Sequence, residues 1–499
     1  MTRHALSDAH LRADPKRHLV KAEPSVTIAS GDQLRVVALP CHRQIRMIFN
    51  KNIILISVSS GRVIIEENRI PLFLITLIGV FRMWSVFLNK MLKQLLRSGT
   101  LIIHFPDGSM QRHGDGGAPS VTVRVIDPTL PARLVRNPDL ALGEAYVEGT
   151  LTIDNDDLHS FLALVIANTK GGGRQVWWRR IQNAARVMLR SAGQLNTSKR
   201  SAANVEHHYD LSGALYDLFL DADRQYSCGY FIHPDDTLEQ AQMQKKAHIA
   251  AKLCLQPGMT VLDIGSGWGG MAITLARDYG AKVVGLTLSQ EQYKSSVARA
   301  AEAGLSDRVS FQLIDYRKFV GKFDRVVSVG MFEHVGVPHY AEYFRRVKDF
   351  LTPDGVALIH SIGRAAPPSS TNPWVAKYIF PGGYVPALSE MSAAVEKSGL
   401  WPTDVEVWRL HYAMTIAHWH RRFEANIDAI RALYDDRFCR MWRYYLVASE
   451  MTFREGRQCV FQMQLANRQD AVPLTRDYIS EASGHPVGTL KQRWDQAAQ

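Results

Sequence analysis

The sequence predicts an α/β protein in which a small α+β domain precedes a Rossmann-like domain built on a mostly parallel sheet. A short apolar segment at 261–264 is followed by a glycine-rich turn and then by a helical pattern at 271–279. Strand and helix patterns continue to alternate as far as residue 359, as expected for a doubly wound sheet. Upstream, residues 100–126 show two-residue alternation and turn signals, which indicate short paired strands.

Composition sets the limits of this prediction. The chain has 499 residues, and its 46% apolar and 21% charged residues exclude a wholly disordered, collagenous or polytopic membrane protein. Five scattered cysteines form no CxxC pair, so we expect no metal site, no disulfide framework and a reducing compartment. Residues 1–99 hold 15 Lys or Arg against 6 Asp or Glu, which accounts for +9 of the net charge of +11. The rest of the chain is nearly neutral, and nucleic acid is not an expected partner.

Residues 1–90 form an N-terminal extension of uncertain status. An apolar run at 70–88 is interrupted by Arg82, which costs about 2.5–3.5 kcal/mol in a spanning helix. The run also lies too far from the N-terminus for a secretory signal peptide. The preferred interpretation is that translation starts at Met83 and that 1–82 is upstream sequence. The alternative is a membrane-associated segment.

Residues 91–169 are expected to form the small α+β domain. Strands are predicted at 99–109 and 119–126, a strand pair at 143–154, and a helix at 157–168. None of these segments carries a catalytic pattern.

Residues 170–200 form a basic linker with eight Lys or Arg and no acidic residue. On a helix, Trp177, Ile181, Ala184 and Met188 share one face, whereas the arginines at 179, 186 and 190 share the other. This pattern is typical of an amphipathic helix in a membrane interface, where each basic residue contributes about 1 kcal/mol near anionic lipid. Packing of the Trp face against the neighbouring domain explains the pattern equally well.

The glycine-rich turn at 265–269 is the first chemical motif. Asp263 precedes it, and glycines are needed because a Cβ would block both the tight turn and the approach of a ligand to the backbone. A dinucleotide site expects an acid about 20 residues further on, but the strand at 281–289 ends in Gly285, Leu286 and Thr287. A nicotinamide oxidoreductase is therefore disfavoured.

Many further motifs, in fixed order over roughly 200–470, resemble the cyclopropane-fatty-acyl-phospholipid synthase family, which includes the mycolic acid cyclopropane synthases. They are HHYDLSGALYDLFLD at 207–221, YSCGYF at 226–231, VLDIGSGWG at 261–269, GLTLSQEQ at 285–292, DYR at 315–317, FEHVG at 332–336, YIFPGG at 378–383 and FREGR at 453–457, with His411, Tyr412, Thr415, Trp419 and Phe423. The domain at 91–169 has a diffuse resemblance to the sterol-carrier-like N-terminal domain of bacterial members. The resemblance implies an S-adenosylmethionine-dependent methyltransferase domain at 201–485.

The resemblance also implies a reaction. The cis double bond of a phospholipid acyl chain attacks the methyl group of S-adenosylmethionine, and the resulting carbocation loses a proton and closes to a cyclopropane. An isolated alkene is a weak nucleophile, so the site must align it and exclude water. In the family a bound bicarbonate acts as the base. The matching positions are Cys228, His360, Tyr412 and the backbone of Ile362, with Glu333 orienting the base or relaying the proton.

By the same resemblance, ten residues are assigned to the methyl donor. Gly265, Gly267 and Gly269 approach its methionine end, and Asp263 precedes them. Thr287 and Gln292 replace the acid at the ribose, Tyr316 and Arg317 flank the adenine, and Tyr226 and Ser227 close over the sulfonium. For each catalytic candidate an ordinary structural role stays open: Cys228 as a small buried side chain, His360 as a core histidine, and Tyr412 as a packing residue.

The expected partners are membrane phospholipids with unsaturated chains and an anionic membrane surface, and the expected location is the cytoplasmic side of the cell membrane. A homodimer is compatible with the sequence. Three other functions stay open: a methyl-branching fatty-acid methyltransferase, a small-molecule N-methyltransferase, and a lipid carrier without catalysis. The first would use nearly the same residues, whereas the last is suggested only by the N-terminal domain.

Overall fold

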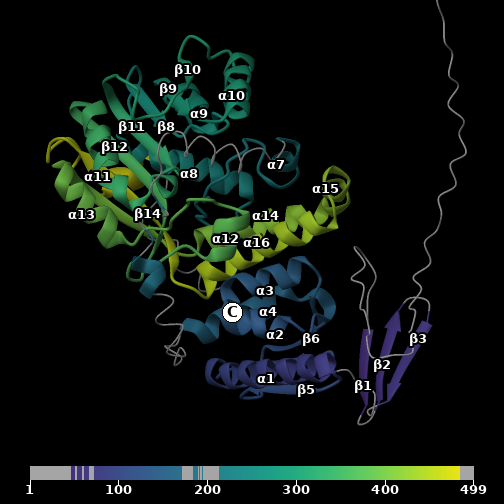
Figure 1. Cartoon of the computed structure of the whole chain (residues 1–499). Coiled ribbons are helices and arrows are strands. Elements are labelled where there is room, and N and C mark those ends of the chain that lie inside the picture. The colour runs from purple at the N-terminus through teal and green to yellow at the C-terminus, as the bar shows by residue number, and fades with distance from the viewer. Residues whose placement is uncertain are drawn as a thin grey trace, which may run out of the picture.

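The computed structural model describes residues 46–50, 53–58, 61–66, 72–170, 184–188, 190, 194 and 213–483. These residues form three sheets with accompanying helices (Figure 1). The first sheet is a small antiparallel one, made of β1 (Arg46–Asn50), β2 (Ile53–Val58) and β3 (Gly61–Glu66).

A long helix, α1 (Leu72–Leu95), follows and lies along one side of the N-terminal domain (Figure 1). It runs without a break through Met83, the preferred translation start. Leu88 and Met91 are buried, and the Arg136 guanidinium lies 4.7 Å from the centre of the Trp84 ring. No helix in the described part of the chain has the length and apolar character needed to span a membrane.

The N-terminal domain has a four-stranded sheet in the order β5-β4-β6-β7, in which β4 and β6 are parallel. The predicted strand pair at 143–154 is wrong in its first half, because residues up to Val147 belong to a helix. A Cβ on Gly143 would lie 2.6 Å from the Trp374 ring, so the glycine allows this helix to pack closely against a distant segment. The elements are β4 (Thr100–His104), β5 (Met110–Gly114), β6 (Ser120–Val125), α2 (Leu130–Arg136), α3 (Pro138–Val147), β7 (Leu151–Ile153), η2 (Asp154–Asp156) and α4 (Leu158–Lys170).

The linker prediction is tested only at residues 184–188, 190 and 194, because Trp177, Arg179 and Ile181 lie outside the described residues. Arg186 donates to Asp139 at 3.0 Å, and Arg190 lies 2.9 Å from Glu390 and donates to the Tyr384 hydroxyl at 2.8 Å. Met188, by contrast, is 79% exposed. Both arginines are therefore held by groups of the protein, which favours packing over a contact of these two side chains with lipid.

The C-terminal domain is built on a seven-stranded sheet in the order β10-β9-β8-β11-β12-β14-β13. Neighbours from β10 to β12 are parallel, and β14 is antiparallel to both β12 and β13. The predicted Rossmann-like class is confirmed. The strands are β8 (Thr260–Ile264), β9 (Lys282–Thr287), β10 (Val309–Leu313), β11 (Phe323–Val329), β12 (Leu351–Arg364), β13 (Trp401–Trp408) and β14 (Gln458–Ala466).

Helices cover this sheet and separate it from the N-terminal domain. The pair α14 and α16 lies between the sheet and the helices of the N-terminal domain (Figure 1). Across this boundary Arg443 of α16 lies 2.9 Å from Asp156, and Glu450 lies 3.2 Å from His159. The helices are α7 (Gly213–Phe219), α8 (Leu238–Lys252), α9 (Gly270–Tyr279), α10 (Gln290–Glu302), η3 (Phe332–His334), η4 (Val337–His339), α11 (Tyr340–Phe350), α12 (Pro373–Tyr378), α13 (Leu388–Ser398), α14 (His411–Ala425), α15 (Ile427–Leu433), α16 (Asp436–Arg454) and α17 (Asp477–Ala482).

Candidate functional site

The turn between β8 and α9 is formed by glycines in the left-handed region. Gly265 and Gly267 have φ of +84° and +54°. A Cβ on Gly265 would lie 2.8 Å from Met331, whereas a Cβ on Gly267 would meet no atom within 4 Å. The turn therefore packs tightly on one side and leaves its backbone open on the other, as a ligand-binding turn requires.

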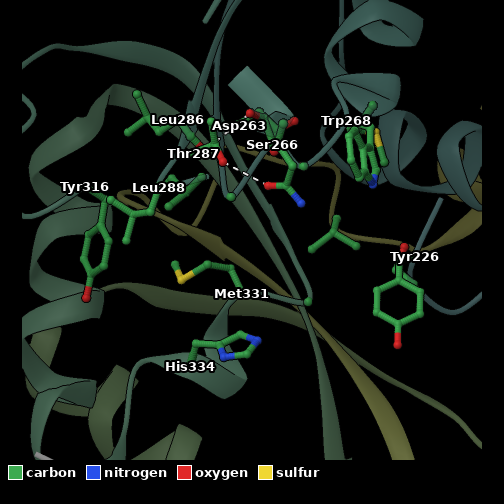
Figure 2. A pocket seen from close by; sticks show the side chains of 18 of the residues that line it. Tyr226, Asp263, Ser266, Trp268, Leu286, Thr287, Leu288, Tyr316, Met331 and His334 are labelled. Carbon is green, nitrogen blue, oxygen red and sulfur yellow. Dashed lines mark hydrogen bonds between the residues drawn. The ribbon is translucent and has the colours of Figure 1, made fainter. Parts of the chain in front are cut away.

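This turn lines a cavity at the carboxyl ends of the parallel strands, which we call the glycine-turn cavity. Figure 2 shows Tyr316 at one side, Trp268 and Tyr226 at the other, and Met331 with His334 along the edge between them. Arg317 also lines the cavity and is fixed by an ion pair with Asp315 at 2.6 Å. The cavity is elongated between aromatic side chains and suits a ligand with an aromatic ring at one end.

Asp263, the last residue but one of β8, is the charged group most directly placed for a ligand. It is 2% exposed, and its Oδ2 atom has no hydrogen-bond partner among the described residues. Burial raises the pKa of its carboxyl to about 7. An unpaired buried carboxylate is costly, so this group favours a cationic or hydrogen-bond-donating ligand.

The end of β9 carries uncharged polar groups instead of an acid. Thr287 Oγ1 donates to Gln292 Oε1 at 3.0 Å (Figure 2). The Ser289 amide donates to Thr287 Oγ1 at 3.2 Å. Both Thr287 and Gln292 line the glycine-turn cavity. These groups can hydrogen-bond ligand hydroxyls without adding charge.

A second cavity shares Tyr226, Ser227, Gly330 and His334 with the first and extends from there between α12, α14 and α16. We call it the aromatic cavity, because aromatic side chains dominate its walls. Its other lining residues include Trp374, Phe380, Tyr384, Tyr412, Ile416, Tyr444, Tyr445, Ala448 and Phe453. The two cavities thus meet at one place, and the aromatic cavity has the more apolar walls.

Glu333 lies in η3, just after β11, and lines the aromatic cavity. The Ile362 amide donates to its Oε1 atom at 2.6 Å, whereas its Oε2 atom has no hydrogen-bond partner among the described residues. Burial raises the pKa of the Glu333 carboxyl to about 7. The group is therefore oriented by one oxygen and free to exchange a proton at the other.

His360 and Cys228 add uncharged polar groups to the same cavity. Gln462 Nε2 lies 3.1 Å from His360 Nδ1. The other ring nitrogen, His360 Nε2, is therefore the one that can form a hydrogen bond with a ligand in the cavity. Burial holds the pKa of His360 well below its usual value and raises that of the Cys228 thiol, so both are neutral near pH 7. Tyr412 lies against the Phe453 ring at 4.9 Å between centroids.

The sequence-predicted site residues divide between the two cavities, except that Tyr226 and Ser227 line both. Cys228, Glu333, His360, Ile362 and Tyr412 all line the aromatic cavity. Nine of the ten donor-site candidates line the glycine-turn cavity, and Gly269 does not: a Cβ there would lie 2.8 Å from Phe311 and from Ser296. Gly269 therefore serves packing. The Ile362 amide is already used by Glu333, so it supports that carboxyl instead of facing an anion.

Several lining residues were not predicted. Trp268 and His334 stand inside recognised motifs and were not assigned to the site, although His334 reaches both cavities. Met331 and Ile314 are apolar residues next to motifs and Leu288 lies inside one, and their spacing alone gives no signal. Phe380 and Tyr384 also line the aromatic cavity, whereas the nearby Tyr378 hydroxyl donates to Glu144 at 2.9 Å.

Comparison with known proteins adds independent information. The family model described as mycolic acid cyclopropane synthetase matches residues 196–463, and a model for a domain of unknown function matches 87–171. A probable fatty acid methyltransferase of Pseudomonas putida is 37% identical, and the cyclopropane-fatty-acyl-phospholipid synthase of Escherichia coli K12 is 38% identical; each alignment covers 68% of this chain and 86% of the relative. The crystal structure of mycolic acid cyclopropane synthase CmaA1 with SAH and CTAB superposes on this chain with a TM-score of 0.50 and 33% sequence identity. The alignment covers 53% of this chain and 98% of that one.

Proposed function

This chain belongs to the mycolic acid cyclopropane synthetase family and is an S-adenosylmethionine-dependent methyltransferase, and from that premise we propose that it forms cyclopropane fatty acids. A methylene group would pass from S-adenosylmethionine to the cis double bond of unsaturated acyl chains of membrane phospholipids. The observation that carries the proposal is the junction of the two cavities at Tyr226 and Ser227, with Glu333 at the apolar side. The matches at 196–463 and 87–171 support a division into domains at 201–485 and 91–169.

The glycine-turn cavity fits the methyl donor. When bound, S-adenosylmethionine supplies an electrophilic methyl group on a positively charged sulfur. The open backbone at Gly267 gives room beside the turn, and the unpartnered Asp263 Oδ2 suits the donor's ammonium group. Tyr316 and Arg317 lie at the end where an adenine would stack.

The aromatic cavity fits an acyl chain. Its apolar walls exclude water, which would otherwise trap a carbocation, and its ring faces stabilise positive charge. Tyr226 stands where the two cavities meet, and its hydroxyl is fixed by the Tyr445 hydroxyl at 2.8 Å. A rigid ring at this position favours one alignment of alkene and methyl group.

The polar side chains of the aromatic cavity fit a small oxyanion, and we propose bicarbonate. It supplies a base of moderate strength when bound. His360 is neutral and can form a hydrogen bond, and Tyr412 lines the same cavity. The neutral Cys228 thiol donates to the Gly229 carbonyl at 3.3 Å and would turn toward a bound anion. Glu333 holds or moves a proton at Oε2, while the Ile362 amide keeps the carboxyl in place.

Product analysis tests the proposal directly. Expressed in a bacterium that lacks cyclopropane lipids, the protein is expected to add one CH₂ to monounsaturated phospholipid chains. The product should resist mild hydrogenation and give high-field ring-proton signals in NMR. A hydrogenation-sensitive or branched product would instead indicate the methyl-branching reaction, and unchanged lipids would contradict the proposal.

The substrate lies in a bilayer, and we propose that the exposed face of α1 meets the anionic cytoplasmic surface of the membrane. Met83, Val86 and Phe87 are 46%, 65% and 46% exposed, although all three are apolar. The exposed Lys90 and Lys93 follow on the same helix, which contains no acidic residue. Apolar side chains followed by basic ones complement an anionic lipid surface.

Replacing Met83, Val86 and Phe87 together by Ser is expected to weaken binding to vesicles of phosphatidylglycerol and phosphatidylcholine at least tenfold. Activity on detergent-dispersed lipid should be unchanged, because these residues lie outside both cavities. The matched control replaces Val320 and Leu474, which are 87% and 94% exposed, by Ser. Binding is measured by co-sedimentation with the vesicles. Equal binding of the variant and the wild type would contradict a contact between α1 and the membrane. Dimerisation of the protein through this face in the absence of lipid would contradict it as well.

A further inference from the structure

A fully buried lysine lies under the junction of the two cavities. Lys245 of α8 is 0% exposed, and its ammonium nitrogen donates to Gln225 Oε1 at 2.7 Å and to Ser227 Oγ at 2.8 Å. Both acceptors are uncharged. A buried ammonium group is costly unless its hydrogen bonds are made, so these two contacts strongly constrain the side chains that accept them.

The segment that Lys245 holds is the partition between the cavities. Arg224 and Gln225 line the glycine-turn cavity, Cys228 lines the aromatic cavity, and Tyr226 and Ser227 line both. The same helix also fixes the backbone of this segment, since Gln242 Nε2 donates to the Ser227 carbonyl at 2.9 Å. One face of α8 therefore supports the partition through backbone and side chains.

Three acidic groups, Asp221, Asp223 and Asp263, interact electrostatically with Lys245, and the Asp263 Oδ2 atom has no hydrogen-bond partner among the described residues. The other two are held by other partners. Asp223 lies 2.5 Å from both Lys246 and Arg299, and Asp221 accepts from the Gln225 amide at 2.8 Å. Burial lowers the pKa of Lys245 to about 7, so the side chain can lose its charge beside a cationic ligand and still donate hydrogen bonds. Lys245 can therefore affect the reaction without touching a substrate atom.

We propose that Lys245 is a positioning residue that acts through Ser227 and Gln225. It keeps the partition at the place where the methyl group of the donor and the double bond of the acyl chain come into line. The inference rests on the proposed function and adds a residue to it. Since alignment is realised in the transition state, its loss lowers kcat more than it raises KM.

Lys245→Met removes the hydrogen bonds at nearly constant volume. We expect kcat to fall at least tenfold, with KM for phospholipid and Kd for S-adenosylmethionine changed less than threefold. Lys252→Met is the matched control: Lys252 lies on the same helix, is also 0% exposed, and is held at 2.5 Å by Glu406, outside both cavities. It should lose thermal stability while keeping kcat within threefold.

A double-mutant cycle separates positioning from general support. Ser227→Ala should lower kcat to a similar extent, and Ser227→Ala with Lys245→Met should be no worse than Lys245→Met alone. Additive losses, or an unchanged kcat in Lys245→Met, would overturn the inference. If Lys245→Met does not fold, Lys245→Gln, which keeps a donor, replaces it in the cycle. An inactive wild-type enzyme would count against the proposed function, whereas an active wild type with an equally active Lys245→Met would count only against this inference.

Discussion

Glu333→Gln is expected to lower turnover by about 10²–10⁴-fold, the range typical of a lost proton-transfer group. The amide keeps the size of the side chain and can still accept from the Ile362 amide, but it cannot take up a proton at the position of the unpartnered Oε2. Binding of S-adenosylmethionine, measured by calorimetry, should change less than twofold, because Glu333 lines the aromatic cavity and not the glycine-turn cavity.

The pH profile provides a second readout. Burial raises the pKa of Glu333 to about 7, and the ionised form is the one that accepts a proton. With S-adenosylmethionine kept saturating, so that the protonation of Asp263 does not limit donor binding, wild-type turnover should therefore rise as the pH increases through about 7, and this rise should be absent from the residual turnover of Glu333→Gln. Glu406→Gln is the control, since Glu406 is paired with His248 at 2.7 Å and lines neither cavity. Wild-type rates in Glu333→Gln would remove this residue from the reaction.

Asp263→Asn is expected to weaken binding of S-adenosylmethionine about 10–100-fold, which corresponds to the loss of one charge-assisted hydrogen bond of about 1.5–3 kcal/mol. The unpartnered Oδ2 of Asp263 is the group that would receive the donor's ammonium. In the wild type the affinity should fall as the pH drops below about 7, because protonation of the Asp263 carboxyl removes its charge. Titration calorimetry at several pH values measures both effects.

The same substitution is expected to stabilise the ligand-free protein. The pKa of Asp263 is raised on folding, so above the unfolded-state value of about 3.9 its ionisation favours the unfolded chain, and this penalty grows until the pH reaches about 7. Asparagine removes the penalty, and the Tm without ligand should rise at neutral pH. Unchanged affinity together with unchanged Tm would contradict the environment described for Asp263.

The Rossmann-like sheet was predictable because its signals are local. The strand before Gly265, the turn itself and the helix that begins at Gly270 follow from apolar runs and glycines within about a dozen residues. The segment at 143–147 failed for the opposite reason. In isolation the segment resembles a strand, but it continues the helix that begins at Pro138, and its Gly143 packs directly against Trp374, more than 200 residues away.

The linker shows how charge patterns mislead when their partners are distant in sequence. Arg186 and Arg190 occupy a helix face that suits an anionic membrane, yet Asp139 and Glu390 lie at hydrogen-bonding distance from them. A basic stripe indicates that negative charge is nearby, but it does not indicate whether that charge belongs to a lipid or to the protein itself.

By itself, the sequence determined the fold class and, through short motifs shared with a known family, many of the fourteen predicted residues that line the two cavities. The meeting of the cavities depends on tertiary packing. Lys245 has no motif of its own, and its importance comes from Ser227 and Gln225, which precede it by about 20 residues on another segment. Burial also sets the protonation behaviour of Glu333 and Asp263, since removal from water raises a carboxyl pKa and only the folded chain excludes that water.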